Sequence, residues 1–196
     1  MKKYELTNEV KVEFGVTLHR TRALIDIKRW DVKSGDTGGW IESEANLDQD
    51  GEAWVYGDAW VSGNALVSGN ARVYGNARVY GDARVYDNAL VSDNARVYGD
   101  ARVSGNALVY GDARVYKTAH VLTVGLIGSR DDTTTFFRAK FSAGFAISVC
   151  CGCFRGTVDE FRAKVKQTHG DSKYGKAYQL AADLAETQIE IDKEAL

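Results

Sequence analysis

The chain contains no proline, one methionine, three cysteines and three histidines in 196 residues. A lack of proline fits a chain that is mostly repetitive β-structure, because proline cannot donate to a β-ladder. Three cysteines, two of them adjacent, do not make the paired framework of a disulfide-stabilised secreted domain. No apolar run reaches the roughly 20 residues of a membrane-spanning helix, and the start MKKYELTNEV lacks the apolar core of a signal peptide. We therefore expect a cytoplasmic protein without a membrane partner.

An excess of charge of either sign is also missing. The formal net charge is −2, from 25 basic and 27 acidic side chains. Because proteins that bind nucleic acid or anionic membranes through their global charge are strongly basic, we do not expect nucleic acid as a partner.

A six-residue repeat dominates the middle of the chain. Residues 51–122 form twelve consecutive units without a slip in frame, as in GNARVY GDARVY DNALVS. Valine at one position and alanine four residues later are spaced to point into a coil, whereas Gly and Asn or Asp between them accept the positive φ of a tight corner. Each unit is thus a strand and a corner, and three units close a coil of eighteen residues.

This pattern resembles the hexapeptide-repeat family, and the resemblance covers all twelve units. It implies a left-handed parallel β-helix that assembles into a homo-oligomer, most simply a trimer. Many members of that family are acyltransferases that use a histidine base, loops between the coils and coenzyme A. Here His120 is the only histidine in the repeat, and twelve uninterrupted units leave no inserted loop.

Spacing of eighteen residues sorts the outward side chains into three faces. The first face carries a surface ladder of arginines and tyrosines: Arg78, Arg96, Arg114, Tyr80, Tyr98 and Tyr116. Rungs about 4.8 Å apart bring like charges close together, so tyrosine faces and corner aspartates balance them, or an anionic ligand or partner does, or the face is a subunit contact. The third face is expected to end at His120.

The second face is the most apolar of the three. It carries the residues expected at an oligomer interface: Trp54, Leu90, Leu108, Tyr74 and Tyr110.

Residues 1–40 are expected to cap the first coil, with β-type alternation in residues 16–27 and turns in residues 32–40. Residues 47–53 hold two more residues than the frame allows, which predicts a bulge near residues 49–51. This entry to the repeat resembles that of a little-characterised bacterial and phage group, often labelled polymer-forming or transferase-like. The matching residues are Val32, Lys33, Gly35, Asp36, Gly38, Gly39, Ile41, Glu42, Gly51 and residues 53–57.

Residues 123–196 are predicted to form a separate α+β module after the β-helix of residues 41–122. Strands are expected at TVGLI, TTTFFRAKF and AISVCC, and a capping box from Thr157 to Glu160 predicts a helix to about Thr168. A second helix is expected over residues 172–191, with Tyr178, Leu180, Ala181, Leu184 and Ile189 largely on one side. The stretches IGSRDDTTTFFR, CGCFRGTVDEF and THGDSKYGK resemble a small module found on phage and prophage proteins.

This module contains polar side chains near turns and strand ends that are able to bind a phosphate-bearing ligand if they converge. The candidates are Ser129, Arg130, Thr133, Thr135, Arg138, Arg155 and His169. The alternative is that they are surface polar residues of a small domain.

Two other patterns in this module have simpler explanations. Cys150, Cys151 and Cys153 lack the paired spacing of a zinc site, so we predict no metal, and a reactive thiol beside His169 or Arg155 is the alternative to ordinary reduced cysteines. The stretch GDSKYGKA nearly spells a phosphate-binding loop but lacks the Ser or Thr after lysine and joins two helices.

The sequence thus favours a non-catalytic, phage- or prophage-type accessory protein without a cofactor. In this hypothesis a rigid β-helix oligomer presents a C-terminal binding module that captures a nucleotide signal or blocks a host protein. An acyltransferase and a structural or virion component are the alternatives.

Overall fold

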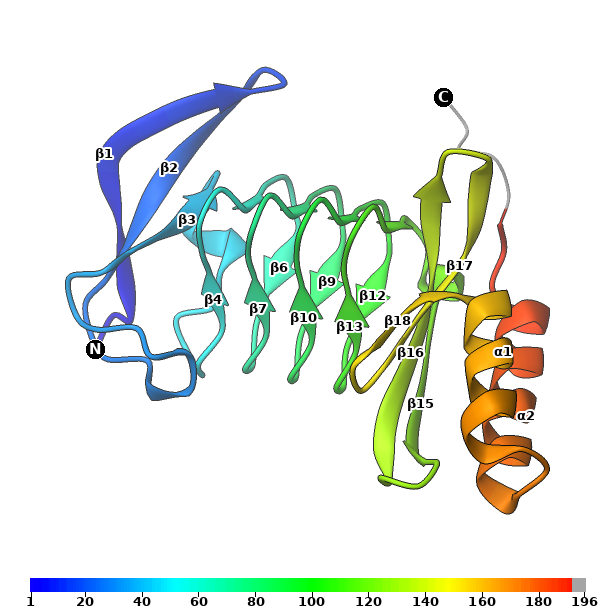
Figure 1. The fold of residues 1–196 in the computed structure, drawn as a ribbon. Helices are drawn as coiled ribbons and strands as arrows, with labels where there is room; N and C mark the ends of the chain where they lie inside the picture. Colours follow the sequence, from blue (N-terminus) through cyan, green and yellow to red (C-terminus); the bar gives the residue numbers. More distant parts are fainter. Residues whose placement is uncertain (192–196) are drawn as a thin grey trace.

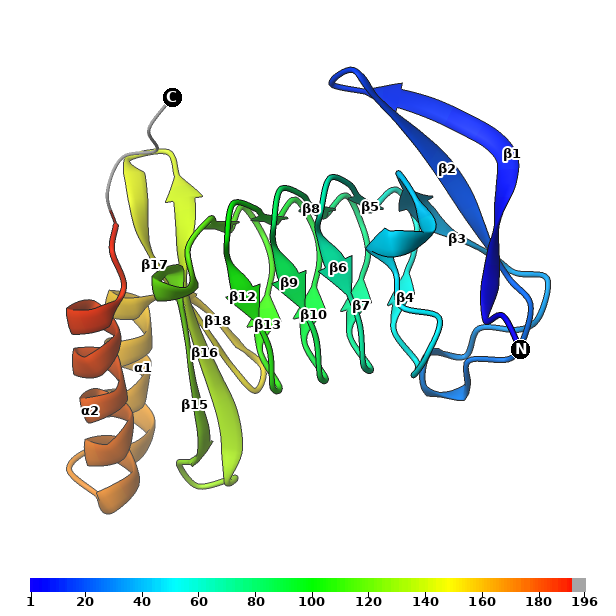
Figure 2. The same ribbon diagram turned by 180° about the vertical axis from the view of Figure 1, so that it is seen from behind.

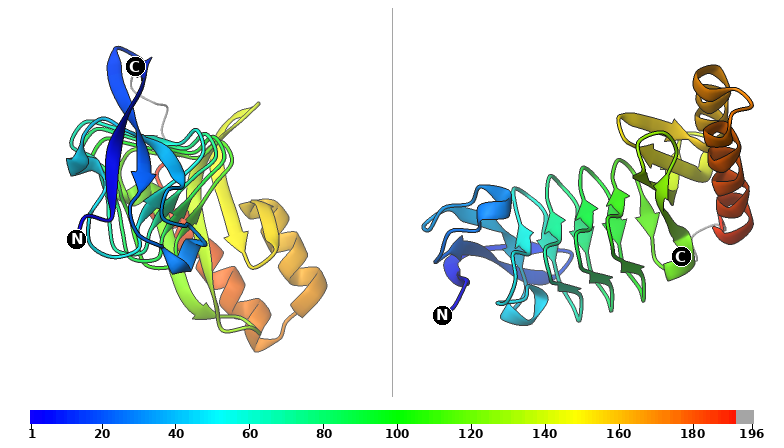
Figure 3. Two further views of the ribbon diagram at one scale, coloured as in Figure 1. Left: turned by 90° about the vertical axis from the view of Figure 1, so that its left-hand side faces the viewer. Right: turned by 90° about the horizontal axis from the view of Figure 1, so that it is seen from below.

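The computed structural model describes residues 1–191 as an elongated molecule built from three parts in a row (Figure 1). A β-hairpin and a short strand lie at the N-terminal end, the coils of a β-solenoid form the middle, and an antiparallel sheet backed by two helices closes the other end. The view from behind and the view from below show the same order (Figures 2 and 3). The predicted mainly-β fold, with a repeat coil and a small C-terminal domain, is confirmed.

The solenoid consists of two-residue strands that pair in parallel with strands eighteen residues away, for example Arg78 with Arg96. Its strands are β4 (Trp54–Val55), β5 (Trp60–Val61), β6 (Leu66–Val67), β7 (Arg72–Val73), β8 (Arg78–Val79), β9 (Arg84–Val85), β10 (Leu90–Val91), β11 (Arg96–Val97), β12 (Arg102–Val103), β13 (Leu108–Val109) and β14 (Arg114–Val115). They form the three predicted faces: β5-β8-β11-β14, β4-β7-β10-β13 and β6-β9-β12.

The interior of the solenoid holds one valine and one alanine from each unit. The valines from Val55 to Val115 and the alanines from Ala53 to Ala113 that follow the repeat are 0–1% exposed. Each coil buries little by itself, so stability comes from stacking of neighbouring coils through backbone hydrogen bonds, such as the one of 3.0 Å from Arg72 N to Ala89 O.

The corners require positive φ, which glycine supplies in most units. Asp87 and Asp93 replace this glycine and adopt φ of 58° and 59°. Each aspartate carboxylate accepts a hydrogen bond from a corner amide one coil further on, at Gly105 (3.0 Å) and Gly111 (3.1 Å). These bonds offset the backbone strain of a non-glycine residue in this conformation.

The N-terminal cap is a hairpin of β1 (Tyr4–Glu13) and β2 (Val16–Ala23), followed by η1 (Lys28–Trp30), β3 (Thr37–Ile41) and η2 (Glu44–Asn46). Strand β3 continues the first face, with Trp40 beside Trp60. That pair is twenty residues apart, whereas Trp60 and Arg78 are eighteen apart, so the predicted two-residue insertion is confirmed. The sequence had not indicated β1 as a strand, and β3 lies in a segment predicted to be turns.

The C-terminal cap is a four-stranded antiparallel sheet in the order β15 (Val121–Ile127), β16 (Asp132–Phe141), β17 (Gly144–Cys151) and β18 (Phe154–Thr157). Strand β16 lies against the last coil, where the amide of Lys140 donates to the carbonyl of Asp112. Helices α1 (Val158–His169) and α2 (Lys173–Gln188) pack on the sheet through Phe136, Phe161 and Tyr178.

Three details of the predicted C-terminal region are wrong. The unit ending in Leu122 forms η3 (Thr118–His120) and the start of β15, so His120 is not a rung of the third face. Helix α2 ends at Gln188, and its buried face uses small alanines, leaving Leu180 and Leu184 exposed at 67% and 48%. Strand β18 was not predicted because its four residues include a glycine and show no alternation of apolar and polar side chains.

Candidate functional site

The tip of the N-terminal hairpin is a two-residue turn made of Phe14 and Gly15. Both residues have positive φ, 51° and 80°. Such turns favour Asn, Asp or Gly at the first position, because a side chain clashes with the backbone there. Phe14 nevertheless occupies this position, and 77% of its surface is exposed. In Figure 1 the hairpin leans over the solenoid.

A groove of about 330 Å³ lies between this tip and the first face of the solenoid. Its floor comes from strands β5, β8 and β11, and β5 and β8 run along the upper edge in Figure 2. The lining residues are Phe14, Val16, Trp60, Ser62, Arg78, Tyr80 and Arg96.

An aromatic stack runs beside the groove along the solenoid. The ring centroids of Trp60 and Tyr80 are 5.7 Å apart, those of Tyr80 and Tyr98 are 4.9 Å apart, and those of Tyr98 and Tyr116 are 5.6 Å apart. The predicted tyrosine ladder is therefore a physical stack. Since the rings contact each other at the rung spacing, the stack stiffens this face of the solenoid.

The three ladder arginines have different surroundings. Arg114 is 9% exposed and donates to the carbonyls of Ala113 and Asn94 at 2.8 and 3.1 Å. Arg78 and Arg96 are half-buried, and within residues 1–191 neither guanidinium forms an ion pair or a side-chain hydrogen bond. Arg78 lies 5.1 Å from the Phe14 ring centroid and 5.7 Å from that of Trp60.

The charge around the groove is positive, although the whole chain is slightly acidic. Burial lowers the pKa of Lys11; the carboxylates of Glu13 and Asp58 oppose this, while the charges of Arg20 and Arg78 add to it. Burial also lowers the pKa of Arg114, and the charges of Arg96 and Arg78 add to this effect. The cations on this face therefore lie close enough to repel one another, and carboxylates such as Asp58 and Asp112 offset part of that repulsion; an anion in the groove would offset more of it.

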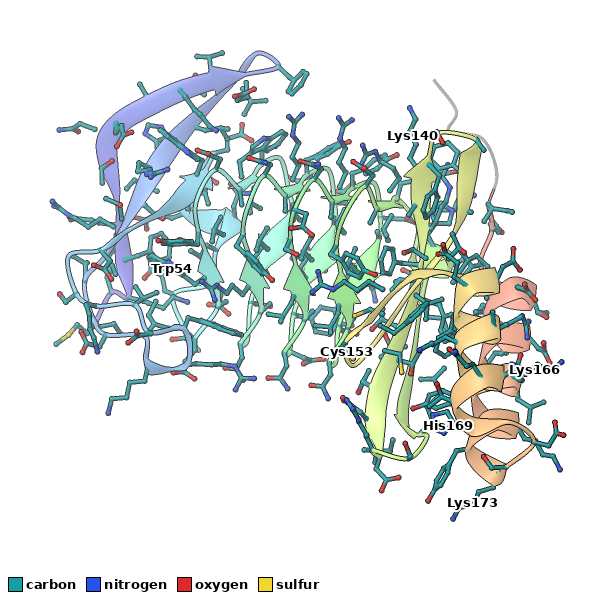
Figure 4. The ribbon with its side chains drawn as sticks, in the orientation of Figure 1. Trp54, Lys140, Cys153, Lys166, His169 and Lys173 are labelled. Atoms are coloured by element: carbon teal, nitrogen blue, oxygen red, sulfur yellow. The ribbon has the colours of Figure 1, made fainter. Side chains whose placement is uncertain are left out.

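The C-terminal candidates do not converge on one site. Ser129, Arg130 and His169 line a second pocket of about 200 Å³ together with Lys164 and Cys153. The floor of this pocket is apolar, from Phe154, Phe161 and Val165, and Asp132 adds an acid at its edge. Figure 4 shows Cys153 at the turn between β17 and β18 and His169 at the end of α1.

Two of the candidates fasten the sheet to the solenoid instead. Both Thr135 and Arg138 are fully buried; Thr135 Oγ1 accepts from the amide of Leu108 at 3.1 Å, and Arg138 Nη1 donates to the carbonyl of Arg114 at 3.0 Å. Their assignment as ligand-binding residues is therefore wrong, because both side chains are buried and hydrogen-bonded where the C-terminal cap meets the solenoid.

Two further candidates lie outside the second pocket. Arg155 lies over the Tyr110 ring at 4.3 Å, and Thr133 is half-buried in β16. The start of α1 is also occupied, because the Glu160 carboxylate accepts from the amide of Thr157 at 2.8 Å.

Most of the predicted oligomer face is covered by the two caps. Trp54 is fully buried against Tyr4, and the Tyr110 hydroxyl donates to the carbonyl of Val149 at 3.1 Å. Leu108 is half-buried beneath β16. Tyr74 and Leu90 remain half-exposed between the caps, so the apolar part of this face is narrower than the sequence suggested.

The remaining candidates for chemistry find no support in the geometry. Within residues 1–191, no group of three or more His, Cys, Asp or Glu side chains is placed to hold a metal ion. His120 is fully buried, and its Nδ1 accepts from the amide of Tyr116 at 3.3 Å, so it does not face solvent as a general base. Gly170 ends α1 and Ser172 caps α2, so the GDSKYGKA stretch joins two helices as predicted.

The stacked parallel coils define a repeat β-helix protein. A family model described as the YdcK beta solenoid repeat matches residues 71–85, 83–99, 91–105, 95–111 and 101–117, all within the coils. Residues 71–117 of this chain are therefore similar to a family of β-solenoid repeats, in agreement with the stacked coils. No curated protein matches the chain. Within residues 1–191, neither helix is long and apolar enough to cross a membrane.

Two residues of these sites, Lys164 in the second pocket and Phe14 in the groove, were not predicted as site residues from the sequence. Lys164 lies on the exposed side of α1, where a lysine carries no signal. Phe14 had a detectable signal, because a Phe-Gly pair between two alternating segments marks a hairpin turn in which phenylalanine is unusual.

Proposed function

We propose that the protein is a non-catalytic binding protein that captures a phosphate-bearing anion in the groove between the hairpin tip and the arginine ladder. The observation that carries the proposal is the pair of half-buried arginines Arg78 and Arg96, whose guanidiniums have no carboxylate partner among the described residues. An arginine fork matches the oxygens of phosphate, and two forks one rung apart, about 4.8 Å, are able to share one phosphate or diphosphate group.

Comparison with the other arginines supports this assignment. Arg162 is paired with Asp183 and Glu186, and Arg138 is engaged with a backbone carbonyl. Arg72 is also half-buried without a carboxylate and lies over aromatic rings, as Arg78 does, but Arg72 belongs to β7 on the second face and does not line the groove. Arg78 and Arg96 both line the groove, and both have unused hydrogen-bond donors.

The proposal is tested by isothermal titration of the purified chain with inorganic diphosphate. We expect binding that weakens at least tenfold in Arg78→Gln and in Arg96→Gln. Arg102→Gln is the matched control, because Arg102 occupies the same repeat position on another face and is exposed. If diphosphate does not bind, or if Arg102→Gln weakens binding equally, the groove is not an anion site.

The biological setting is part of the same proposal. A stiff solenoid that captures a nucleotide-like signal fits a phage- or prophage-type accessory protein in the host cytoplasm, and blocking of a host protein is the alternative use.

We also propose a homo-oligomer, expected to be a trimer from the resemblance of the repeat, with Tyr74 and Leu90 at the contact. Native mass spectrometry of the gently purified protein reports the subunit number and any retained ligand together. A monomer would contradict the oligomer without affecting the groove.

A further inference from the structure

The hairpin tip contains a residue whose conformation folding alone does not explain. Phe14 adopts φ of 51°, in a turn position where a bulky side chain is strained. Burial does not compensate for this strain, because 77% of the residue is exposed. A strained and exposed aromatic residue at the mouth of a cationic groove indicates a contact with something outside the chain.

The Phe14 ring is held beside the two groups that would bind the anion. Its centroid lies 6.4 Å from that of Trp60, at an interplanar angle of 38°, and Arg78 lies 5.1 Å from it. Trp60 itself is only 6% exposed and stacks on Tyr80, so its ring is largely used within the protein. Phe14 is therefore the aromatic surface that remains available to a ligand in this groove.

We infer that the ligand is a nucleoside phosphate, with its phosphate on Arg78 and Arg96 and its planar base stacked on Phe14. This inference rests on the proposed function of the groove and specifies its ligand. Stacking of a base on an aromatic side chain, next to guanidiniums that hold the phosphate, is how proteins bind nucleotides without reading a sequence.

The volume of the groove is suited to a small molecule. A volume of about 330 Å³ is at the lower end of small-molecule sites. The next cation along the ladder, Arg114, is buried and bonded to backbone carbonyls, so the row of available guanidiniums ends after Arg96. A long polyanion would find no third ladder arginine available on this face, whereas a mononucleotide needs none.

The residues that line the groove also predict which part of the ligand the protein recognises. No carboxylate or carboxamide side chain lines the groove, and the hydroxyls of Ser62 and Tyr80 both donate and accept hydrogen bonds, so the edge of the base is recognised only weakly once the two arginines hold the phosphate. Stacking depends on ring area, and a purine should therefore bind more tightly than a pyrimidine, but by less than tenfold.

The experiment is calorimetric titration of the full chain with four probes: AMP, UMP, ribose 5-phosphate and inorganic diphosphate. We expect AMP to bind at least tenfold more tightly than ribose 5-phosphate. Phe14→Asn should abolish the preference for AMP over ribose 5-phosphate while diphosphate still binds, and it should relieve the backbone strain of the turn because asparagine favours positive φ. Phe141→Leu is the control, since Phe141 is an exposed phenylalanine at the end of β16 that does not line the groove.

Each outcome separates this inference from the proposed function. If AMP and ribose 5-phosphate bind equally and Phe14→Asn changes neither, the base is not recognised, although the groove remains an anion site. If none of the probes binds, both proposals are wrong. If a single-stranded oligonucleotide binds at least a hundredfold more tightly than AMP, the ligand is a polymer and the inference is overturned.

Discussion

The guanidinium of Arg138 donates a hydrogen bond of 3.0 Å to the carbonyl oxygen of Arg114, and so joins strand β16 to the last strand of the solenoid. The same guanidinium lies 3.6 Å from the Phe145 ring centroid and 5.2 Å from that of Tyr116. A solenoid that ended with open strand edges would be prone to associate with other chains, so this contact protects the exposed end.

We predict that Arg138→Met destabilises the protein by roughly 2–4 kcal/mol, because a charged hydrogen bond and two desolvated cation–π contacts are lost from a buried site. Arg155→Met is the control: Arg155 is exposed and lies over Tyr110, so its loss should cost less than about 1 kcal/mol. Urea unfolding followed by tryptophan fluorescence measures both. Equal stability of the Arg138 variant and the wild type would show that Arg138 does not fasten the cap.

The corner glycines offer a comparison between conformational strain and close packing. Gly99 and Gly111 have similar φ, 61° and 64°, but a Cβ at Gly99 would lie 2.6 Å from the carbonyl oxygen of Tyr116, whereas a Cβ at Gly111 would meet open space. Both alanine variants pay a strain of about 1–2 kcal/mol for positive φ. We expect Gly99→Ala to lose at least about 1 kcal/mol more than Gly111→Ala, since overpacking adds to the strain. Thermal unfolding of the pair checks this, and identical losses would contradict the close contact.

Lys3 gives the protein an unusual dependence of stability on pH. Its side chain is 1% exposed and donates to the carbonyls of Asp50 and Ala53, and burial lowers its pKa to about 8. Between that value and the ordinary lysine pKa near 10.5, the unfolded chain holds a proton that the folded chain has released. The free energy of unfolding should therefore rise with pH in this window, by up to about 1.4 kcal/mol per pH unit.

Urea unfolding at about pH 7, 8.5 and 9.5 measures this slope, because these values lie on both sides of the shifted pKa of Lys3. Lys3→Met should remove it, and Lys2→Met should keep it, because Lys2 lies at the surface in an ion pair with Glu44. A slope that survives in Lys3→Met would assign the effect to another group.

The three cysteines should react in an order set by their surroundings. Cys153 is exposed in the turn between β17 and β18, Cys151 is half-buried and accepts from the Thr134 hydroxyl at 3.2 Å, and Cys150 is buried with its thiol pKa raised by that burial. Since the thiolate is the reactive form, iodoacetamide should label Cys153 first and Cys150 only in denaturant. Peptide mass spectrometry reads the order, and Cys153→Ser should remove the fast phase. Early labelling of Cys150 would contradict its burial.

Sequence alone was sufficient for the parts of this protein that repeat. A period of six fixes the interior valines and alanines, and an offset of eighteen fixes the three outer faces, because each residue in a coil contacts others at a constant distance along the chain. The same frame revealed the two-residue insertion before Ala53. The capping box at Thr157 was also readable, since its partners are three residues apart.

The structure of the two caps could not be predicted in this way, because their contacts join segments that are far apart in the chain. Nothing in the repeat distinguishes Arg114 from Arg78 and Arg96, yet β16 buries the first and the hairpin tip leaves the other two beside an open groove. Trp54 was expected on an oligomer face, but it is covered by Tyr4 from the first residues of the chain. The sequence repeat determined the solenoid scaffold. The tertiary packing of the two caps decided which of the equivalent side chains remain available to bind a ligand. The physical reason is that a local period specifies the neighbours within the coils but not which distant segment folds back over them.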